Sequence, residues 1–301
     1  MNFPADFLRN IRSTFGAEGQ RWLTDLPSLL AMAAQKWGLR LGEPLLLSYN
    51  YVTTAIMADD TPVVLKIGVP NHEFSSEISA LRFFNGDGCA RLLAADDEKF
   101  MFLLERLEPG EMLVSLADDD MRTEIACGVM QQLWRPVAEG MPFIKLGDWF
   151  AELKNLRSKY AGGSGPFPAG LLARVEHLLP DLLAESGSPI LIHGDLHHFN
   201  ILSSSRGWLA IDPKGVIGPP AYECGPLLMN PIPDFPYLPG AIRQTERRIA
   251  ILSEHLGFSR ENIRDWGLCH AILSAWWDLS GAEPGGEYAL AFADVIARAG
   301  N

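Results

Sequence analysis

The spacing of apolar residues divides the chain into two parts of different texture. Residues 1 to about 43 carry apolar side chains at helical spacing, which predicts an amphipathic helix. Residues 71–84 show the same spacing and predict a second helix. On either side of that second helix, short apolar runs bounded by polar turns predict strands over residues 45–49, 51–58, 63–67, 91–95 and 100–105.

A break at residues 108–110 separates this first part from a mostly helical part that runs to about residue 187. A strand-rich segment follows over residues 191–211. A stretch rich in proline and glycine comes next, and two or three helices finish the chain. This order of elements predicts an α+β fold with two lobes, a strand-rich N-lobe and a mainly helical C-lobe.

The composition is that of a globular protein. The chain has 301 residues, of which 48% are apolar and 21% are charged. Lysine and arginine number 25 against 37 aspartates and glutamates, so the net charge is −12. Binding to nucleic acid requires clustered positive charge, so this balance argues against such a partner and permits a cationic small molecule.

The cysteines and the N-terminus bear on location. The four cysteines are widely spaced with no C-x-x-C pair, which predicts buried thiols in a reducing cytosol. The first residues lack the basic start and apolar block of a signal peptide, and no apolar run is long enough to cross a bilayer. A cytoplasmic protein without a membrane partner is therefore expected.

The largest group of candidate catalytic and metal-binding residues follows the apolar run that leads into His193. Asp195 and Asn200 come next, at the five-residue spacing found in kinase catalytic loops. Residues 201–211 predict a hairpin, whose ends meet, so Asn200 and Asp212 should converge on one ion. Phosphoryl transfer needs a carboxylate near the acceptor hydroxyl and Mg²⁺ on oxygen ligands. Asp195 is therefore the candidate base, and Asn200 and Asp212 are the candidate Mg²⁺ ligands.

Two other interpretations of this segment stay open. Each polar residue, taken alone, is better explained as a turn, capping or core residue of an ordinary fold. Alternatively, His193, Asp195, His197 and His198 resemble the ligand cluster of a two-metal hydrolase. Such a hydrolase would give no reason for the candidate residues in the first part of the chain.

Those candidates begin with Lys66, which lies inside a predicted apolar strand and must either reach solvent or face an anion. In a kinase it would contact the nucleotide phosphates and pair with a glutamate on the following helix. Glu73 and Glu77 lie one turn apart on the same face, and periodicity does not choose between them. At the link between the lobes, backbone groups of Glu105 and Leu107 are candidates for binding adenine.

With these residues in order, the chain resembles the aminoglycoside phosphotransferase family, and within it the streptomycin 6-phosphotransferase and hydroxyurea kinase branch. The most specific matches are residues 193–200, 204–209, 211–215 and Gly218, with support from residues 77–82, 90–94 and 103–107. The resemblance implies a protein-kinase-like fold that uses ATP and Mg²⁺ to phosphorylate a hydroxyl of a small molecule.

Carried over residue by residue, the resemblance makes Asp195 the catalytic base and gives Asn200 and Asp212 to Mg²⁺. Lys66 would contact the nucleotide phosphates, and Glu77 is favoured as its partner. Residues 1–107, with the helical extension, would form the nucleotide-binding lobe. Residues 108–301 would form the catalytic and substrate-binding lobe.

The chain departs from the family pattern at three places. Phe199 and Pro219-Pro220 stand where the family often has glutamate, which bears on how the substrate is handled. Residues 48–58, where a nucleotide loop is expected, contain no glycine. The N-terminal helix has no counterpart in the resemblance.

A streptomycin-like acceptor carries guanidinium groups, so carboxylates should line its cleft. Asp278, beside Trp276 and Trp277, is favoured among the candidates, although the tryptophans suit a helix core better than a stacking surface. The full set is Asp118, Asp119, Asp120, Glu223, Asp278, Glu283 and Glu287. Other functions considered are a metabolite kinase with no resistance role, a nucleotide-binding pseudokinase and, least expected, a protein kinase, since no A-P-E sequence follows Asp212.

Overall fold

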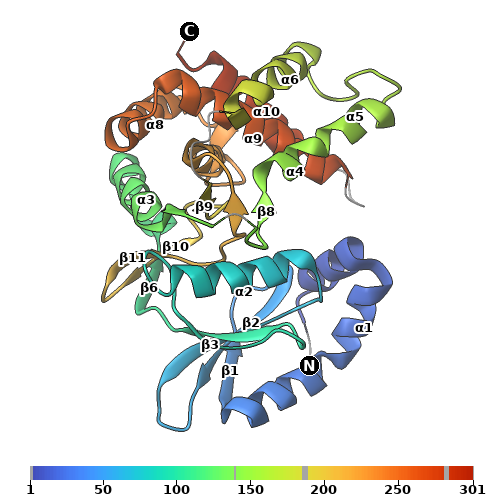
Figure 1. The fold of residues 1–301 in the computed structure, drawn as a ribbon, viewed down its shortest axis with the longest axis vertical. Helices are drawn as coiled ribbons and strands as arrows, with labels where there is room; N and C mark the ends of the chain where they lie inside the picture. Colours follow the sequence, from blue (N-terminus) through green and yellow to red (C-terminus); the bar gives the residue numbers. More distant parts are fainter. Residues whose placement is uncertain (1–2, 139, 185–188, 281–284, 301) are drawn as a thin grey trace.

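The computed structural model describes residues 3–138, 140–184, 189–280 and 285–300. Figure 1 shows a strand-rich lobe built from the first third of the chain and a helical lobe built from the rest. The first lobe contains a five-stranded antiparallel sheet in the order β1-β2-β3-β5-β4. Its strands are β1 (Arg40–Pro44), β2 (Asn50–Ile56), β3 (Pro62–Gly68), β4 (Leu92–Asp96) and β5 (Met101–Glu105).

Helices cover both faces of this sheet. Helix α1 (Ala5–Trp37), kinked at Gly16, covers one face, and α2 (His72–Phe84) lies between the other face and the second lobe (Figure 1). Alternate side chains of β3 point to opposite faces, as the strand period of two requires. Leu65 therefore packs in the core under α1, whereas Lys66 faces α2. The predicted helix over residues 71–84 and the predicted strand over residues 63–67 are confirmed. The N-terminal helix is confirmed only as far as Trp37, because Gly38 ends it in a left-handed conformation and residues 40–44 form β1.

The predicted strand over residues 45–49 is wrong. These residues form the connection between β1 and β2, and Leu46 is 86% exposed. The β1 register already shifts between Leu41 and Pro44, and proline has no N–H to continue the ladder. Apolar composition alone predicted a strand there, but only Leu47 of the segment packs on the core, and its four neighbours are exposed.

The second lobe contains two small sheets, β11-β10-β6 and β7-β9-β12-β8. Both join segments distant in sequence, and strands as short as β7 and β8 give no sequence pattern to detect. The strands are β6 (Pro109–Met112), β7 (Arg135–Pro136), β8 (Ile144–Lys145), β9 (Ile190–Ile192), β10 (Ile201–Ser204), β11 (Gly207–Ala210) and β12 (Val216–Ile217). The predicted hairpin is confirmed as β10 and β11.

Helices make up most of the second lobe. They are α3 (Asp119–Leu133), α4 (Leu146–Ala151), α5 (Leu153–Lys159), α6 (Ala169–Ala184), α7 (Cys224–Met229), α8 (Ala241–Leu256), α9 (Arg260–Ser280) and α10 (Glu287–Arg298), with short 3-10 turns at Leu113–Ser115, Pro220–Glu223 and Phe235–Tyr237. No helix in the described ranges is both long and apolar enough to span a bilayer. The four cysteines are buried and unpaired, as predicted.

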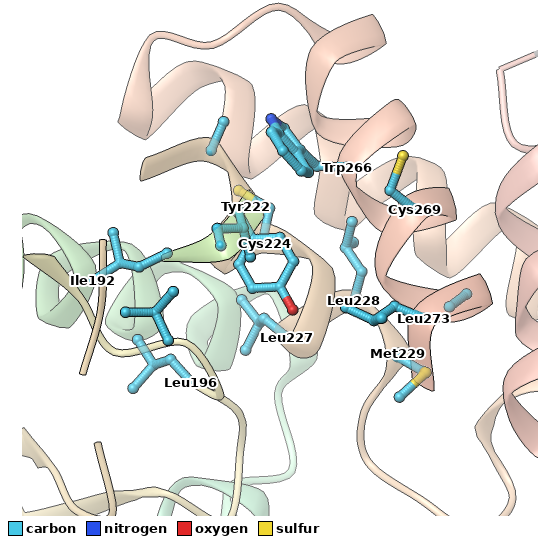
Figure 2. Close-up of a cluster of buried hydrophobic side chains, with 14 of the residues drawn as sticks. Ile192, Leu196, Tyr222, Cys224, Leu227, Leu228, Met229, Trp266, Cys269 and Leu273 are labelled. Carbon is cyan, nitrogen blue, oxygen red and sulfur yellow. The ribbon is translucent and has the colours of Figure 1, made fainter. Parts of the chain in front are cut away.

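The core of this lobe supports the loop that carries the candidate chemistry. Tyr222, Leu227 and Trp266 pack between α7 and α9, and the side chains of Ile192 and Leu196 join the same cluster (Figure 2). Ile192 ends β9, and Leu196 directly follows Asp195. Burial of residues on both sides of the His-Gly-Asp turn therefore fixes where that turn lies.

Candidate active site

The loop between β9 and β10 is organised by a buried histidine. His193 is fully buried, and its Nδ1 accepts a hydrogen bond from the Asp195 N–H at 3.2 Å. Nε2 therefore carries the proton and donates to the Ile211 carbonyl at 2.8 Å. Burial lowers the pKa of His193 to about 4, so the ring stays neutral. His193 thus links the strand before Asp195 to the residue before Asp212.

Glu223 stabilises the same turn through its carboxylate. Its two carboxyl oxygens accept the backbone N–H groups of His193 at 2.9 Å and Gly194 at 2.7 Å. Gly194 has φ of 89°, and a Cβ there would stand 2.7 Å from a Val216 methyl carbon. Only glycine fits this position. Burial raises the pKa of Glu223 to about 8, although the two N–H donors oppose the rise.

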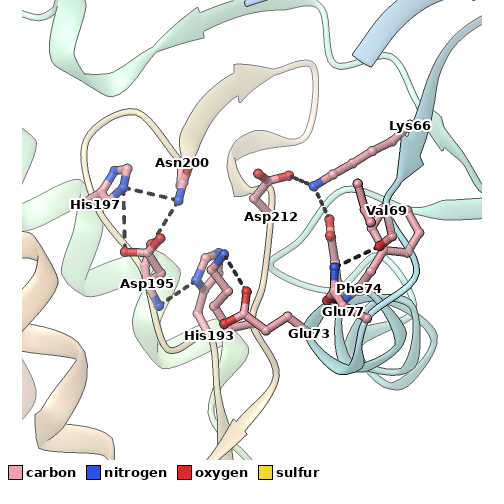
Figure 3. A network of polar contacts seen from close by, with 12 residues as sticks. Lys66, Val69, Glu73, Phe74, Glu77, His193, Asp195, His197, Asn200 and Asp212 are labelled. Carbon is pink, nitrogen blue, oxygen red and sulfur yellow. Dashed lines mark hydrogen bonds and ion pairs between the residues drawn. The ribbon is translucent and has the colours of Figure 1, made fainter. Parts of the chain in front are cut away.

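The candidate base, Asp195, is held through its backbone and not through its carboxylate. The Asn200 side-chain nitrogen donates to the Asp195 carbonyl at 3.0 Å, and His197 Nε2 lies 3.7 Å from Asp195 Oδ1 (Figure 3). The Asp195 side chain remains 37% exposed. Its carboxylate is therefore free to meet a hydroxyl that enters from solvent.

The structure brings Lys66, Glu77 and Asp212 together across the two lobes. Lys66 Nζ lies 2.7 Å from Glu77 Oε1 and 2.6 Å from Asp212 Oδ1 (Figure 3). Glu77, and not Glu73, is thus the partner of Lys66. Burial opposes the charge of Lys66, but the two carboxylates outweigh it and raise its pKa. Lys66 in turn lowers the pKa of Asp212 against the effect of burial.

Asn200 and Asp212 fit Mg²⁺ as oxygen ligands. The Ile211 N–H donates to the Asn200 carbonyl at 2.9 Å, which places Asn200 next to the residue that precedes Asp212. The Asn200 side-chain nitrogen donates to the Asp195 carbonyl, which leaves the side-chain oxygen available to bind a metal ion. The Asp212 side chain is 45% exposed and uses Oδ1 for Lys66. Hard oxygen donors of this kind suit Mg²⁺.

The histidine-rich cluster does not form a metal site. Within the described ranges, no three His, Cys, Asp or Glu side chains gather closely enough to hold an ion. His193 is bonded to backbone, and His198 is fully buried, with Arg248 and Arg122 among the charges around it. The interpretation as a two-metal hydrolase therefore loses its ligand set.

At the link between the lobes, the backbone N–H and the carboxylate of Glu105 already make hydrogen bonds within the protein. The Glu105 N–H donates to the Arg91 carbonyl at 3.0 Å, and its carboxylate accepts the Arg91 N–H at 2.7 Å and pairs with Arg206. Its N–H is therefore not free for adenine. Leu107, half-buried, follows two residues later. Adenine binding by Glu105 and Leu107 stays a prediction.

Most of the candidate acceptor carboxylates are bound to other parts of the protein. Asp119 makes a two-pronged ion pair with the buried Arg248, and Glu223 holds the turn described above. Asp118 caps α3, and Asp120 pairs with Arg247.

The favoured candidate, Asp278, lies beside Gly285 near the end of α9, and the neighbouring Trp276 is buried in the core. Glu287 begins α10, and Glu283 lies outside the described residues.

His270, a buried histidine of α9, is expected to make the stability of the protein depend on pH. The Tyr222 hydroxyl and His270 Nδ1 are 3.0 Å apart, and burial lowers the pKa of His270 to about 4. Below about pH 6.5, His270 of the unfolded chain binds a proton, whereas His270 of the folded protein stays neutral. The free energy of unfolding is therefore unaffected by this group above that pH. It decreases as the pH falls toward 4, by at most about 1.4 kcal/mol per pH unit for each such proton.

We expect His270→Gln, which keeps a polar partner for Tyr222, to show a shallower loss of unfolding free energy between pH 6.5 and 4 than the unsubstituted protein. Denaturant titrations at several pH values measure this slope. The exposed His177→Gln is the control and should keep the original slope. Equal slopes for all three proteins would contradict the assignment of the proton to His270.

Comparison with known proteins agrees with this geometry. Residues 47–281 match the family described as aminoglycoside/hydroxyurea antibiotic resistance kinase. A streptomycin 6-kinase from Streptomyces glaucescens is 31% identical, with 93% of this chain and 91% of that protein covered. A hydroxyurea phosphotransferase from Kitasatospora aureofaciens is also 31% identical, with coverage of 94% and 82%.

A solved structure described as a choline kinase from Streptococcus pneumoniae has the same fold. It superimposes with a TM-score of 0.58 at 15% identity, over 90% of this chain and 98% of that one. The predicted protein-kinase-like fold and the predicted family resemblance are both confirmed. The chain therefore belongs to the aminoglycoside/hydroxyurea antibiotic resistance kinase family and is a kinase that transfers phosphate to a hydroxyl group.

Proposed function

We propose that this protein transfers the terminal phosphoryl group of ATP, with Mg²⁺, to a hydroxyl of a small cationic antibiotic of the streptomycin type or to hydroxyurea. The acceptor class comes from the acceptors of two relatives that align with most of the chain, the streptomycin 6-kinase and the hydroxyurea phosphotransferase. The observation that carries the chemistry is the 2.6 Å contact between the buried Lys66 and the half-exposed Asp212, which joins the two lobes. A nucleotide triphosphate is the ligand that such a pair is suited to bind.

The charge of each active-site residue suggests its role in the transfer. Asp195 would orient the acceptor hydroxyl and receive its proton, because its carboxylate is exposed while its backbone is fixed. Lys66 would bind phosphate oxygens, with Glu77 keeping it in place. Asn200 and Asp212 would hold Mg²⁺, which neutralises the phosphate charge when bound.

We also propose that one lobe binds the nucleotide and the other binds the acceptor. Residues 1–107 would bind the nucleotide, because they supply Lys66 and Glu77. Residues 108–301 would bind the acceptor, because they supply Asp195 and the loop around it. A cytoplasmic location is part of the proposal, since ATP is present there.

The test is nucleotide turnover by the purified protein with ATP and Mg²⁺, with and without streptomycin, other aminoglycosides and hydroxyurea. We expect ADP release that depends on streptomycin or hydroxyurea, together with a phosphorylated acceptor in the mass spectrum. Turnover only with a different hydroxylated metabolite would replace the acceptor and keep the chemistry. Nucleotide binding without turnover on any acceptor would favour a pseudokinase.

A further inference from the structure

Lys214 is a second lysine close to the candidate active-site residues, and the mechanism above gives it no role. It stands two residues after Asp212, and its backbone N–H donates to the His193 carbonyl at 2.8 Å. The following residue, Gly215, accepts a hydrogen bond from the Ser76 hydroxyl of α2 at 3.1 Å. The segment that carries Lys214 is therefore fastened both to the catalytic loop and to the helix that carries Glu77.

The side chain of Lys214 begins beside the His-Gly-Asp turn, and its ammonium group lies 3.8 Å from Glu73 of α2. A Cβ built on Gly194 would stand 3.3 Å from the Lys214 Cβ, so the side chain starts beside the residue that precedes Asp195. The charges acting on its ammonium group are those of Glu73, Asp195, Asp212 and Glu77. The ammonium group thus lies in the field of both the candidate base and the candidate metal ligand.

Unlike Lys66, Lys214 has no strong partner of its own. Lys66 is 3% exposed and makes two contacts below 3 Å, to Glu77 and Asp212. The Lys214 side chain is 36% exposed, and within the described ranges its one ion-pair contact is with Glu73 Oε2 at 3.8 Å. Glu73 is itself largely exposed, so this contact is weakly held. A cation placed among carboxylates and loosely paired is available to an anionic ligand.

We propose that Lys214 is a further catalytic residue, which binds the phosphoryl group as it passes from the nucleotide to the acceptor held at Asp195. This inference rests on the proposed function. The bond from the terminal phosphorus to the bridging oxygen breaks, and that oxygen leaves with ADP. A new bond forms from the acceptor oxygen to phosphorus, and the hydroxyl proton passes to Asp195 and then to water. Lys214 stays protonated and offsets charge on the oxygens of the transferring group.

The test compares Lys214→Met, which removes the ammonium group and keeps the length, with Lys214→Arg, which keeps a positive charge. For Lys214→Met we expect kcat to fall by about 10²- to 10³-fold, the usual cost of one group that stabilises transition-state charge. ADP affinity should be unchanged, while affinity for a non-hydrolysable ATP analogue falls about tenfold in calorimetry. Lys214→Arg should recover part of both losses.

Glu73→Gln is the matched control, because it removes the ion-pair partner and leaves Lys214 in place. A loss of activity in Glu73→Gln equal to that in Lys214→Met would show a structural ion pair and overturn the proposal. So would equal affinities of Lys214→Met and the unsubstituted protein for the ATP analogue. If no acceptor supports turnover, the proposed function fails by itself, and the difference between ADP and the ATP analogue still decides the role of Lys214. Absence of nucleotide binding would overturn both.

Discussion

Asp195→Ala should lower kcat by about 10²- to 10⁴-fold and leave nucleotide affinity and folding stability close to those of the unsubstituted protein. The reason for this separation is structural. The bonds that fix residue 195 are made by its backbone N–H and carbonyl, to His193 and Asn200, and alanine keeps both. Only the exposed carboxylate is lost, together with its 3.7 Å approach to His197.

Steady-state kinetics with the best acceptor and calorimetric titration with a nucleotide measure the two halves of this prediction. Asp25→Ala, an exposed aspartate on α1, is the matched control and should keep full activity. Turnover by Asp195→Ala within tenfold of the original would remove Asp195 from the mechanism. Loss of nucleotide binding together with turnover would show instead that the loop had been disturbed.

The order and spacing of the chemical residues were readable from the sequence, because local rules control them. A hairpin brings its ends together whatever surrounds it, so Asn200 and Asp212 could be placed side by side before the fold was known. An ammonium group inside an apolar strand has to meet an anion, and this singled out Lys66. Periodicity did not separate Glu77 from Glu73, since both lie on one face of α2; the family resemblance favoured Glu77, and the packing of α2 on the sheet places it against Lys66.

Other features depend on contacts that no local pattern encodes. Glu223 was considered only as an acceptor carboxylate, yet its oxygens hold two backbone N–H groups of a turn thirty residues earlier in the chain. A buried carboxylate with backbone partners looks, in sequence, like any other glutamate. The role inferred for Lys214 likewise depends on the fastening of its segment to His193 and Ser76. The apolar residues 45–49 failed as a strand for the same reason, because pairing and burial decide a strand.

The second large effect is expected from Asp212→Asn, which should lower kcat by about 10³-fold and weaken the dependence of nucleotide binding on Mg²⁺. Loss of a charged metal ligand costs several kcal/mol of transition-state stabilisation, and each 1.36 kcal/mol is tenfold in rate. Asparagine suits this position because Asp212 has φ of 61°, a left-handed conformation that asparagine adopts readily. Among the residues that the structure describes, Lys66 then keeps Glu77 as its carboxylate partner.

Titration of turnover and of nucleotide binding with Mg²⁺ measures both effects of Asp212→Asn. The chain offers a matched control in Asp60→Asn, since Asp60 also has a positive φ, 66°, but lies in an exposed turn between β2 and β3. Because the two substitutions make the same chemical change at the same kind of backbone position, a shared loss of activity would point to the backbone. A loss confined to Asp212→Asn, with the Mg²⁺ response weakened, would assign the metal to Asp212. An Asp212→Asn protein that kept its turnover and its Mg²⁺ response would remove Asp212 from the metal site and leave its contact with Lys66 as an ion pair between the lobes.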